Sequence, residues 1–224
     1  MTTLNGFFKM NKSALFVFIE GADGVGKSST MNAILKHYAN SKLRISATHL
    51  IKHTRVGTAF HQDYTNGNIS GLPAVLVMLG STVATLDDIS KAKDNYDIIL
   101  IDRSQASFFA YQLNDTNNRK LLMSAFEETL SSEFYKECNF TTIYLTCDTE
   151  TAKERMLKSR GSLDVIESKG TDYQEYVKQS YQECFKSYQH LAPGCIIDTG
   201  ISDQNTVGEI VIDFVNKQFE SRSK

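Results

Sequence analysis

A glycine-rich segment near the N-terminus carries the residue types of a phosphate-binding loop. It matches G-x-x-x-x-G-K-[ST] and comprises Gly21, Ala22, Asp23, Gly24, Val25, Gly26, Lys27 and Ser28, with Ser29 following. The glycines let successive backbone N–H groups converge on phosphate oxygens at the positive end of a helix. Lys27 is expected to reach the β- and γ-phosphates of ATP, and the Ser28 hydroxyl to bind Mg²⁺. The motif therefore predicts a nucleoside triphosphate site with Mg²⁺, but kinases, ATPases and GTPases share it, so other residues must decide the reaction.

An Asp-Arg pair follows a second apolar run. Asp102 and Arg103 come directly after residues 96–101, whose β-branched side chains are typical of a strand buried on both faces. Because the ends of parallel strands meet at one edge of a sheet, both side chains are expected beside the phosphate loop. Asp102 is suited to hold Mg²⁺ or its water, and Arg103 to bridge donor and acceptor phosphates. The alternative is a salt bridge at a strand end.

A third group of candidate residues is basic. Arg155, Lys158 and Arg160 are spaced so that a helix end or loop brings several positive charges over one polyphosphate. Such charges stabilise phosphoryl transfer when a lid closes and water leaves. The alternative is a solvated basic face beside Glu150 and Glu154.

These residues need a sheet that places them at one edge. Four short apolar runs predict strands, at residues 14–19, 96–101, 141–146 and 194–197. Segments with helical periodicity alternate with them, at residues 27–39, 76–92, 119–130, 149–159, 172–191 and 206–219. This alternation predicts an α/β fold with a parallel sheet. Residues 57–73 show little periodicity and are expected to form a mobile loop beside the site.

Charge and membrane signals limit the ligands and partners. The formal net charge of −2 leaves no broad basic field for polymeric nucleic acid, so a small anionic ligand is expected. No apolar run reaches the roughly 18 residues of a membrane span, and residues 1–12 lack the features of a signal peptide. We expect a cytoplasmic protein whose partners are nucleotides, without nucleic-acid or membrane partners.

Cysteines and histidines give no sign of a metal site. The four cysteines show neither a C-x-x-C pair nor zinc-like spacing, which is typical of reduced thiols in the cytoplasm. Packing or surface roles are expected for His37, His49, His53, His61 and His190.

The candidate segments together resemble the thymidylate kinase family. Residues 18–29 look like the family's phosphate loop with its Asp-Gly pair, here Asp23 and Gly24. Residues 102–112 look like its Asp-Arg segment, followed by Ser and then by Ala-Tyr-Gln. Residues 152–181 are similar to its lid and the helix after it. The resemblance covers roughly residues 15–198, and the order and spacing of the three blocks agree.

The resemblance implies a P-loop kinase fold of the α/β class. In that fold a central parallel sheet of about five strands is flanked by helices, here in a single domain of residues 1–224 with a lid at about 155–168. The implied activity is ATP- and Mg²⁺-dependent phosphorylation of a nucleoside 5′-monophosphate, with dTMP or another pyrimidine deoxynucleotide as acceptor. The oxygen ligands do not distinguish Mg²⁺ from Mn²⁺. A homodimer is also implied.

The resemblance also implies roles for individual residues. The catalytic candidates are Lys27, Arg103, Arg155 and Arg160. Asp23 is expected to contact the sugar and phosphate region of the acceptor, beside Arg103. Ser107, Tyr111 and Gln112 are further acceptor-binding candidates, since an amide can read a pyrimidine edge and an aromatic ring can border the sugar.

The acceptor side departs from the family pattern. An arginine that grips the monophosphate is expected near Thr82, and the aromatic residue that stacks on thymine is replaced by Met78. A threonine offers one neutral hydrogen bond in place of a charged fork, a difference of about 1 to 3 kcal/mol. Arg55 is the remaining candidate for the acceptor phosphate. Two alternatives stay open: a deoxynucleoside kinase, and a degenerate ATP-binding protein without kinase activity. The first is considered because Asp102-Arg103-Ser104 also resembles the Glu-Arg-Ser of deoxynucleoside kinases.

Overall fold

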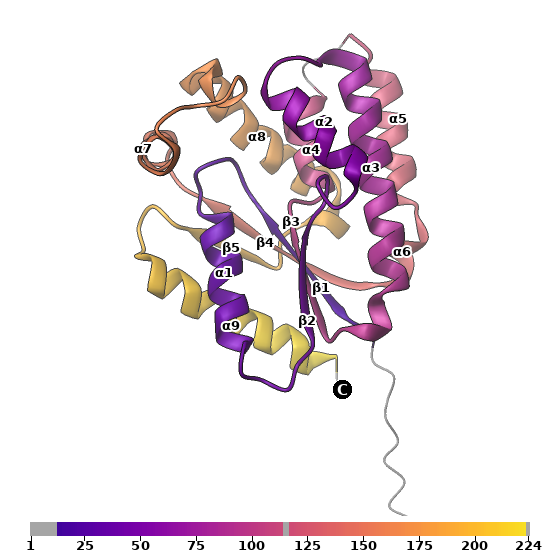
Figure 1. Cartoon of the computed structure of the whole chain (residues 1–224), viewed down its shortest axis with the longest axis vertical. Helices are drawn as coiled ribbons and strands as arrows, with labels where there is room; N and C mark the ends of the chain where they lie inside the picture. The colour runs from indigo at the N-terminus through magenta and orange to yellow at the C-terminus, as the bar shows by residue number, and fades with distance from the viewer. Residues whose placement is uncertain (1–12, 114–116, 223–224) are drawn as a thin grey trace, which may run out of the picture.

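Five parallel strands form the centre of the fold, in the order β2-β3-β1-β4-β5 (Figure 1). The computed structural model describes residues 13–113 and 117–222, with the side chain of Arg160 left out. The strands are β1 (Leu15–Glu20), β2 (Ile45–His49), β3 (Ile98–Asp102), β4 (Asn139–Thr146) and β5 (Cys195–Asp198). The predicted parallel α/β fold is confirmed, and the four predicted strands correspond to β1, β3, β4 and β5.

Helices cover both faces of this sheet. They are α1 (Lys27–Tyr38), α2 (Arg55–Thr65), α3 (Gly71–Lys91), α4 (Gln105–Gln112), α5 (Arg119–Leu130), α6 (Glu133–Glu137), α7 (Thr149–Arg160), α8 (Thr171–Ser187) and α9 (Gln204–Ser221). Three short 3-10 turns are η1 (Lys93–Asn95), η2 (Glu167–Lys169) and η3 (Gln189–Leu191). Helices α1 and α9 pack together on one face, while α3, α4, α5, α6 and α8 lie on the other.

The central strand is apolar on both sides because it faces both helical layers. Leu15, Val17 and Ile19 pack with the side chains of α1 and α9, whereas Phe16 and Phe18 pack with α3 and α6. All five are at most 3% exposed. A strand buried on both faces reads as a continuous apolar run, which is why β1 is visible in the sequence.

The sequence prediction was wrong about residues 57–73. Most of them belong to α2 and to the start of α3, which begins at Gly71. The side chain of Thr54 accepts a hydrogen bond from the backbone N–H of Gly57, which caps α2 at its N-terminus. Helix α2 buries only Gly57 and Phe60, so its sequence shows little apolar periodicity.

Helix α3 meets the length and composition of a membrane span. It is the one helix of the described residues that does so, and half of the apolar window is buried inside the protein. Its buried face includes Val75, Met78, Leu79 and Leu86, which pack in the core. A core helix of a globular domain passes the same test, so the burial accounts for its apolar character.

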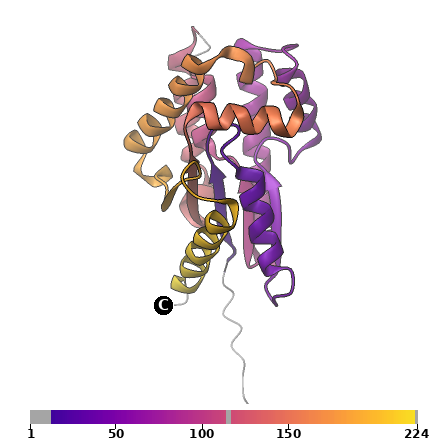
Figure 2. The ribbon, with the colours of Figure 1, turned by 90° about the vertical axis from the view of Figure 1, so that its left-hand side faces the viewer.

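The phosphate loop joins β1 to α1 at the carboxyl edge of the sheet. Gly24 has φ of 81°, and a Cβ atom there would lie 2.3 Å from the carbonyl oxygen of Ala152 in α7. Gly24 is therefore required both by the left-handed backbone and by the close approach of α7. Figure 2 shows α7 crossing above the start of α1. Helix α7 therefore lies next to the phosphate loop.

Candidate active site

A single cavity of about 670 Å³ brings most of the predicted site residues together at the carboxyl edge of the sheet. Its wall includes the candidates Asp23, Gly24, Val25, Gly26, Lys27, Ser28, Ser29, Met78, Asp102, Arg103, Ser107, Tyr111, Gln112 and Arg155. Gly21 and Ala22, at the start of the phosphate loop, are not among the residues that line this cavity. The cavity thus runs from the phosphate loop to α4, which is long enough for two ligands to meet.

Lys27 is folded back over the phosphate loop. Its Nζ donates to the carbonyl oxygens of Gly21 at 3.0 Å and Ala22 at 2.8 Å, and lies 3.6 Å from Oδ1 of Asp23. The side chain is buried, and this burial, with the charge of Arg103, lowers the pKa of Lys27. A phosphate in the loop would give this ammonium group a stronger partner than two neutral carbonyls.

Ser28 and Asp102 fit a magnesium ion. Ser28 is exposed in the cavity at the first turn of α1. Oδ1 of Asp102 is buried and has no hydrogen-bond partner among the described residues. An orphaned carboxylate oxygen is costly to bury, and a hydrated cation is the partner that would satisfy it. Mg²⁺ commonly takes one or two protein ligands and completes its shell with water and substrate phosphates.

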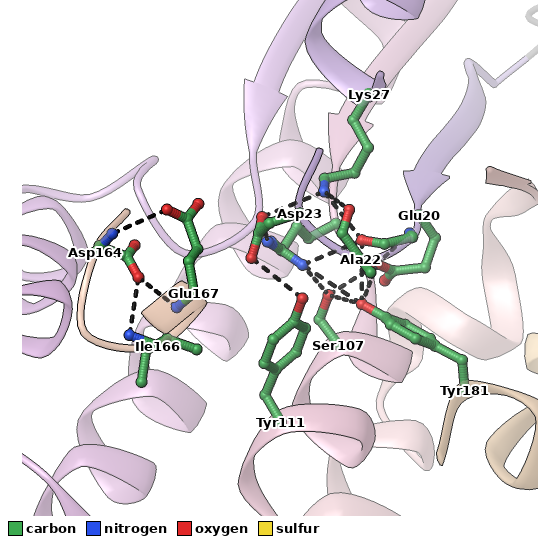
Figure 3. Close-up of polar contacts among 12 residues, drawn as sticks. Glu20, Ala22, Asp23, Lys27, Ser107, Tyr111, Asp164, Ile166, Glu167 and Tyr181 are labelled. Carbon is green, nitrogen blue, oxygen red and sulfur yellow. Dashed lines mark hydrogen bonds and ion pairs between the residues drawn. The ribbon is translucent and has the colours of Figure 1, made fainter. Parts of the chain in front are cut away.

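Arg103 and Asp23 form the charged centre of the site, and Figure 3 shows Asp23 beside Lys27 and Tyr111. Nη2 of Arg103 lies 2.5 Å from Oδ1 of Asp23, and the guanidinium lies 5.1 Å from the centroid of the Tyr111 ring. The Tyr111 hydroxyl donates to Oδ2 of Asp23 at 3.2 Å. Burial disfavours the charge on Arg103, but Asp23 holds its pKa well above the usual value. The pair places one permanent cation between the phosphate loop and α4.

The backbone at Arg103 is unusual. Its φ of 74° makes it the one non-glycine residue with positive φ among those described. This conformation costs about 1 to 3 kcal/mol for a residue with a side chain, and it persists only where surrounding contacts hold it. Nη1 of Arg103 contacts Ser107 Oγ at 3.2 Å and the Tyr181 hydroxyl at 3.4 Å. These contacts stabilise the positive φ of Arg103.

A buried carboxylate that the sequence analysis did not identify lies beneath this pair. Glu20, at the end of β1, is fully buried. Its Oε1 accepts hydrogen bonds from Gly21 N, Ser107 Oγ and the Tyr181 hydroxyl, at 2.8 to 2.9 Å. Its Oε2 accepts from the backbone N and the Oγ of Ser104, both at 2.7 Å. We call this group the Glu20 hub; it ties the phosphate loop to α4 and α8 and supports the side chains that contact Arg103.

The far end of the cavity is lined by apolar and amide groups. Met78 of α3 and Tyr111 of α4 are both buried at its wall. Nε2 of Gln112 donates to the hydroxyl of Tyr64 in α2 at 2.9 Å. Tyr64 stacks on Phe60, with ring centroids 5.6 Å apart. An amide held in place beside a flat apolar wall is suited to recognise the edge of a base.

Of the remaining candidate positions with a described side chain, only Arg155 lines the cavity. Arg55 is exposed at the first position of α2 and does not line the cavity, and Thr82 is buried in α3 away from it. Arg160 is the last residue of α7, and its side chain lies outside what the structure describes. Arg155 does line the cavity, where it donates to the Oγ1 of Thr199 at 3.0 Å and to its carbonyl oxygen at 2.8 Å.

Two histidines and a lysine that were not among the candidate site residues also line the cavity. They are His49, Lys52 and His61, so the two histidines for which packing or surface roles were expected lie at the cavity wall. His49 ends β2, the strand that the sequence analysis missed. Residues 45–49 read Ile-Ser-Ala-Thr-His and remain partly exposed at the sheet edge, so they lack the continuous apolar run of the other strands.

The segment after α7 is ordered by its own carboxylates. Oδ1 of Asp164 accepts from the backbone N of Glu167 at 2.8 Å, and Oε2 of Glu167 accepts from the backbone N of Asp164 at 3.0 Å. This reciprocal pair caps η2 in the manner of a capping box. Both residues line the cavity, so the predicted lid region forms one of its walls.

A parallel sheet with a phosphate loop after its central strand, and an arginine beside that loop at the end of the neighbouring strand, defines a P-loop kinase. The sequence model of the thymidylate kinase family matches residues 19–210, which is most of the chain. The chain therefore belongs to the thymidylate kinase family.

Individual relatives agree with this assignment. The chain is 25% identical to the thymidylate kinase of Photobacterium profundum over 206 residues, covering 88% of this chain and 94% of that protein. It is 26% identical to the thymidylate kinase of Helicobacter pylori strain HPAG1 over 200 residues, with the same coverage of 88% and 94%. The solved structure of thymidylate kinase from Candida albicans shares the fold, with a TM-score of 0.67 at 19% identity over 92% of this chain and 94% of that one.

Proposed function

We propose that the protein transfers the γ-phosphate of ATP to dTMP, forming ADP and dTDP. The observation that carries this proposal is that the phosphate loop, Arg103 and the base-sized wall at Gln112 share one cavity. Membership of the thymidylate kinase family supports dTMP as the acceptor. Neither the family match nor these relatives favour a deoxynucleoside kinase or a degenerate ATP-binding protein.

The donor side would be organised by the phosphate loop. The backbone N–H groups of residues 21–29 and the ammonium group of Lys27 would bind the β- and γ-phosphates of ATP. Ser28 and Asp102 would hold Mg²⁺, which neutralises charge on the phosphates when bound. Mn²⁺ would find the same oxygen ligands.

The acceptor side would bring the phosphate of dTMP into line with the γ-phosphate. Arg103 lies between the loop and α4, where its fork can contact both phosphates. An oxygen of the dTMP phosphate forms a bond to the γ-phosphorus as the bond from that phosphorus to the β–γ bridging oxygen breaks, and ADP leaves. The nucleophile is already an anion, so positioning and charge stabilisation provide the catalysis.

Recognition of the nucleoside would fall to the far wall. Gln112 would contact the thymine edge, Met78 would border the ring and Tyr111 the sugar. Asp23 would bind the sugar and phosphate region once the acceptor competes for Arg103. Ser107 contacts Arg103 directly and would position it.

The basic residues of α7 would serve the closed state. Arg155 already lines the cavity, and both Arg155 and Arg160 lie within the segment of about 155–168 that would act as the lid. Closure over ATP would exclude water and bring positive charge to the transferring group. In this scheme residues 1–224 form a single domain.

A homodimer is the proposed assembly. The outward face of α3 carries Leu76 and Val83, which are 51% and 45% exposed, with the open position Gly80 between them. A stripe of this kind permits close packing of a second copy of the helix. Light scattering of the wild type and of Gly80→Arg tests it: the dimer mass should halve in the variant, and a monomeric wild type would exclude it. A cytoplasmic location agrees with the four free cysteines.

The proposed reaction is tested by measuring ADP formation with ATP and Mg²⁺ against dTMP, dUMP, UMP, dCMP and the corresponding nucleosides. We expect turnover that requires a pyrimidine monophosphate and is greatest with dTMP. Turnover with thymidine but not dTMP would indicate a nucleoside kinase. ATP binding without turnover across the whole panel would contradict the proposal.

A further inference from the structure

Two histidines stand side by side at the acceptor end of the cavity. His49 is the last residue of β2 and pairs in register with Asp102 of β3, so it lies at the same sheet edge as the phosphate loop. His61 lies in α2, and the two ring centroids are 5.9 Å apart at an interplanar angle of 80°. Lys52, in the connection between these elements, lines the same part of the cavity.

The hydrogen bonds of these rings leave free nitrogen atoms in the cavity. Nδ1 of His49 accepts from the backbone N–H groups of Ile51 at 3.1 Å and Lys52 at 3.3 Å. This pattern leaves the proton on Nε2 of His49, which is then a neutral donor. Within residues 13–113 and 117–222, no side chain or backbone group hydrogen-bonds to that Nε2 or to either ring nitrogen of His61.

Cationic side chains lie near both rings, and two carboxylates also act on His61. His49 faces Lys52, Arg103, His61 and Lys27. The charged groups near His61 are the cations Lys52 and Arg103 and the carboxylates Asp23 and Asp164. Burial first, and then Lys52 and Arg103, lower the pKa of both rings, to about 2 for His49. Both rings are therefore neutral near pH 7, with Lys52 and Arg103 close to them. The carboxylates that line the same cavity are Asp23, Asp102, Asp164 and Glu167.

We propose that His49 and His61 bind the phosphate of the acceptor nucleotide, and that acceptor binding is coupled to uptake of a proton by His61. This inference rests on the proposed function and deepens it. Lys52 and the two imidazoles would bind the acceptor phosphate in place of Arg55 and Thr82. Arg55 is exposed and does not line the cavity, and Thr82 is buried in α3.

The coupling follows from the charge of the ligand. A nucleoside monophosphate carries a charge of about −1.5 to −2 near pH 7. A dianion beside the unpaired ring nitrogens favours the imidazolium form of His61 and a charge-assisted hydrogen bond from it. The pKa of His61 is then higher in the complex than in the free enzyme. Acceptor affinity is therefore greatest below the free pKa, and it falls as pH rises through the pKa of the complex.

Calorimetry of dTMP binding measures this proton directly. Titrations at one pH in two buffers with different ionisation enthalpies give the number of protons taken up. The comparison uses the wild-type chain, His61→Gln and the control His53→Gln, a nearby histidine that contacts Thr48 and Asp88 and does not line the cavity. Because the nucleotide's own second pKa contributes equally in all three proteins, the difference between them reports His61.

We expect net proton uptake in the wild type and in His53→Gln, and less uptake in His61→Gln. Steady-state kinetics should show a dTMP KM about 10-fold higher in His61→Gln, with kcat and the KM for ATP changed less than about 3-fold. Circular dichroism confirms that the variant is folded. Equal proton numbers and equal KM values in the three proteins would overturn this inference while leaving the proposed reaction intact. Failure of the wild type to bind dTMP would overturn both.

Discussion

Replacing Glu20 with glutamine keeps the shape of the side chain and removes its charge. The five donors of the Glu20 hub then face one oxygen and one NH₂ group. If the amide oxygen takes the Oε1 position, it still accepts from Gly21, Ser107 and Tyr181. The NH₂ group then meets the hydroxyl and the backbone N–H of Ser104. The hydroxyl can turn to accept, but the buried N–H loses its acceptor.

The magnitude follows from that count. One buried donor without a partner costs about 1 to 3 kcal/mol, and neutral hydrogen bonds replace charge-assisted ones at the remaining positions. We expect Glu20→Gln to lower the free energy of unfolding by about 2 to 4 kcal/mol. Ser107 and Tyr181 also contact Arg103, and a neutral amide oxygen holds them less firmly than a carboxylate does. The guanidinium should therefore be less firmly positioned. We expect kcat to fall about 10-fold, with a smaller change in the KM for ATP.

Urea denaturation and steady-state kinetics measure the two effects. The exposed Glu128→Gln in α5 is a matched control, because it removes the same charge away from the site. It should unfold and turn over like the wild type. If Glu20→Gln unfolds at the wild-type urea concentration and retains wild-type kcat, the reasoning about the Glu20 hub is refuted.

Three further predictions concern the donor, the base and acid stability. Lys27→Met should lower kcat by at least about 100-fold, because the phosphates of ATP lose their ammonium partner. Thermal stability should not fall, because the variant removes a buried charge. A kcat equal to that of the wild type would contradict the donor role of Lys27. Tyr64→Phe should raise the dTMP KM about 3-fold at unchanged kcat, because Gln112 loses its partner; an unchanged KM would separate Tyr64 from the acceptor. Burial lowers the pKa of His49 to about 2, so below about pH 6.5 the unfolded chain binds a proton that the folded chain does not. The free energy of unfolding should therefore decrease by about 1.4 kcal/mol for each unit that the pH is lowered below about 6.5. His49→Gln should flatten this slope in urea titrations at pH 5.5 and 7.5, and an equal slope would show that His49 is not the group.

The fold was predictable where burial is uniform. β1 and most of β3 are buried on both faces, and their continuous apolar runs are visible in the sequence. In β4 the buried stretch Ile143 to Leu145 gives the same signal. β2 lies at the sheet edge and remains partly exposed, so its mixed residues gave no signal. Helix α4 was missed for the opposite reason: all eight of its residues are buried, and a helix without a solvent face shows no amphipathic period.

The site was predictable where function depends on a motif. The phosphate loop and the Asp102–Arg103 pair are local patterns at a strand end, and the structure brings both to one cavity. His49 and His61 come from segments whose approach depends on the paths of β2 and α2, which the sequence did not reveal. Glu20 carried a signal that was not used, since an acid at the end of a continuous apolar run must find buried donors.

The most direct test of the central claim is the fate of the γ-phosphate. Purified protein is incubated with γ-labelled ATP, Mg²⁺ and dTMP, and the labelled products are separated and compared with the ADP formed. The label should appear in dTDP in an amount equal to the ADP formed. Label found in inorganic phosphate, with dTMP recovered unchanged, would contradict it.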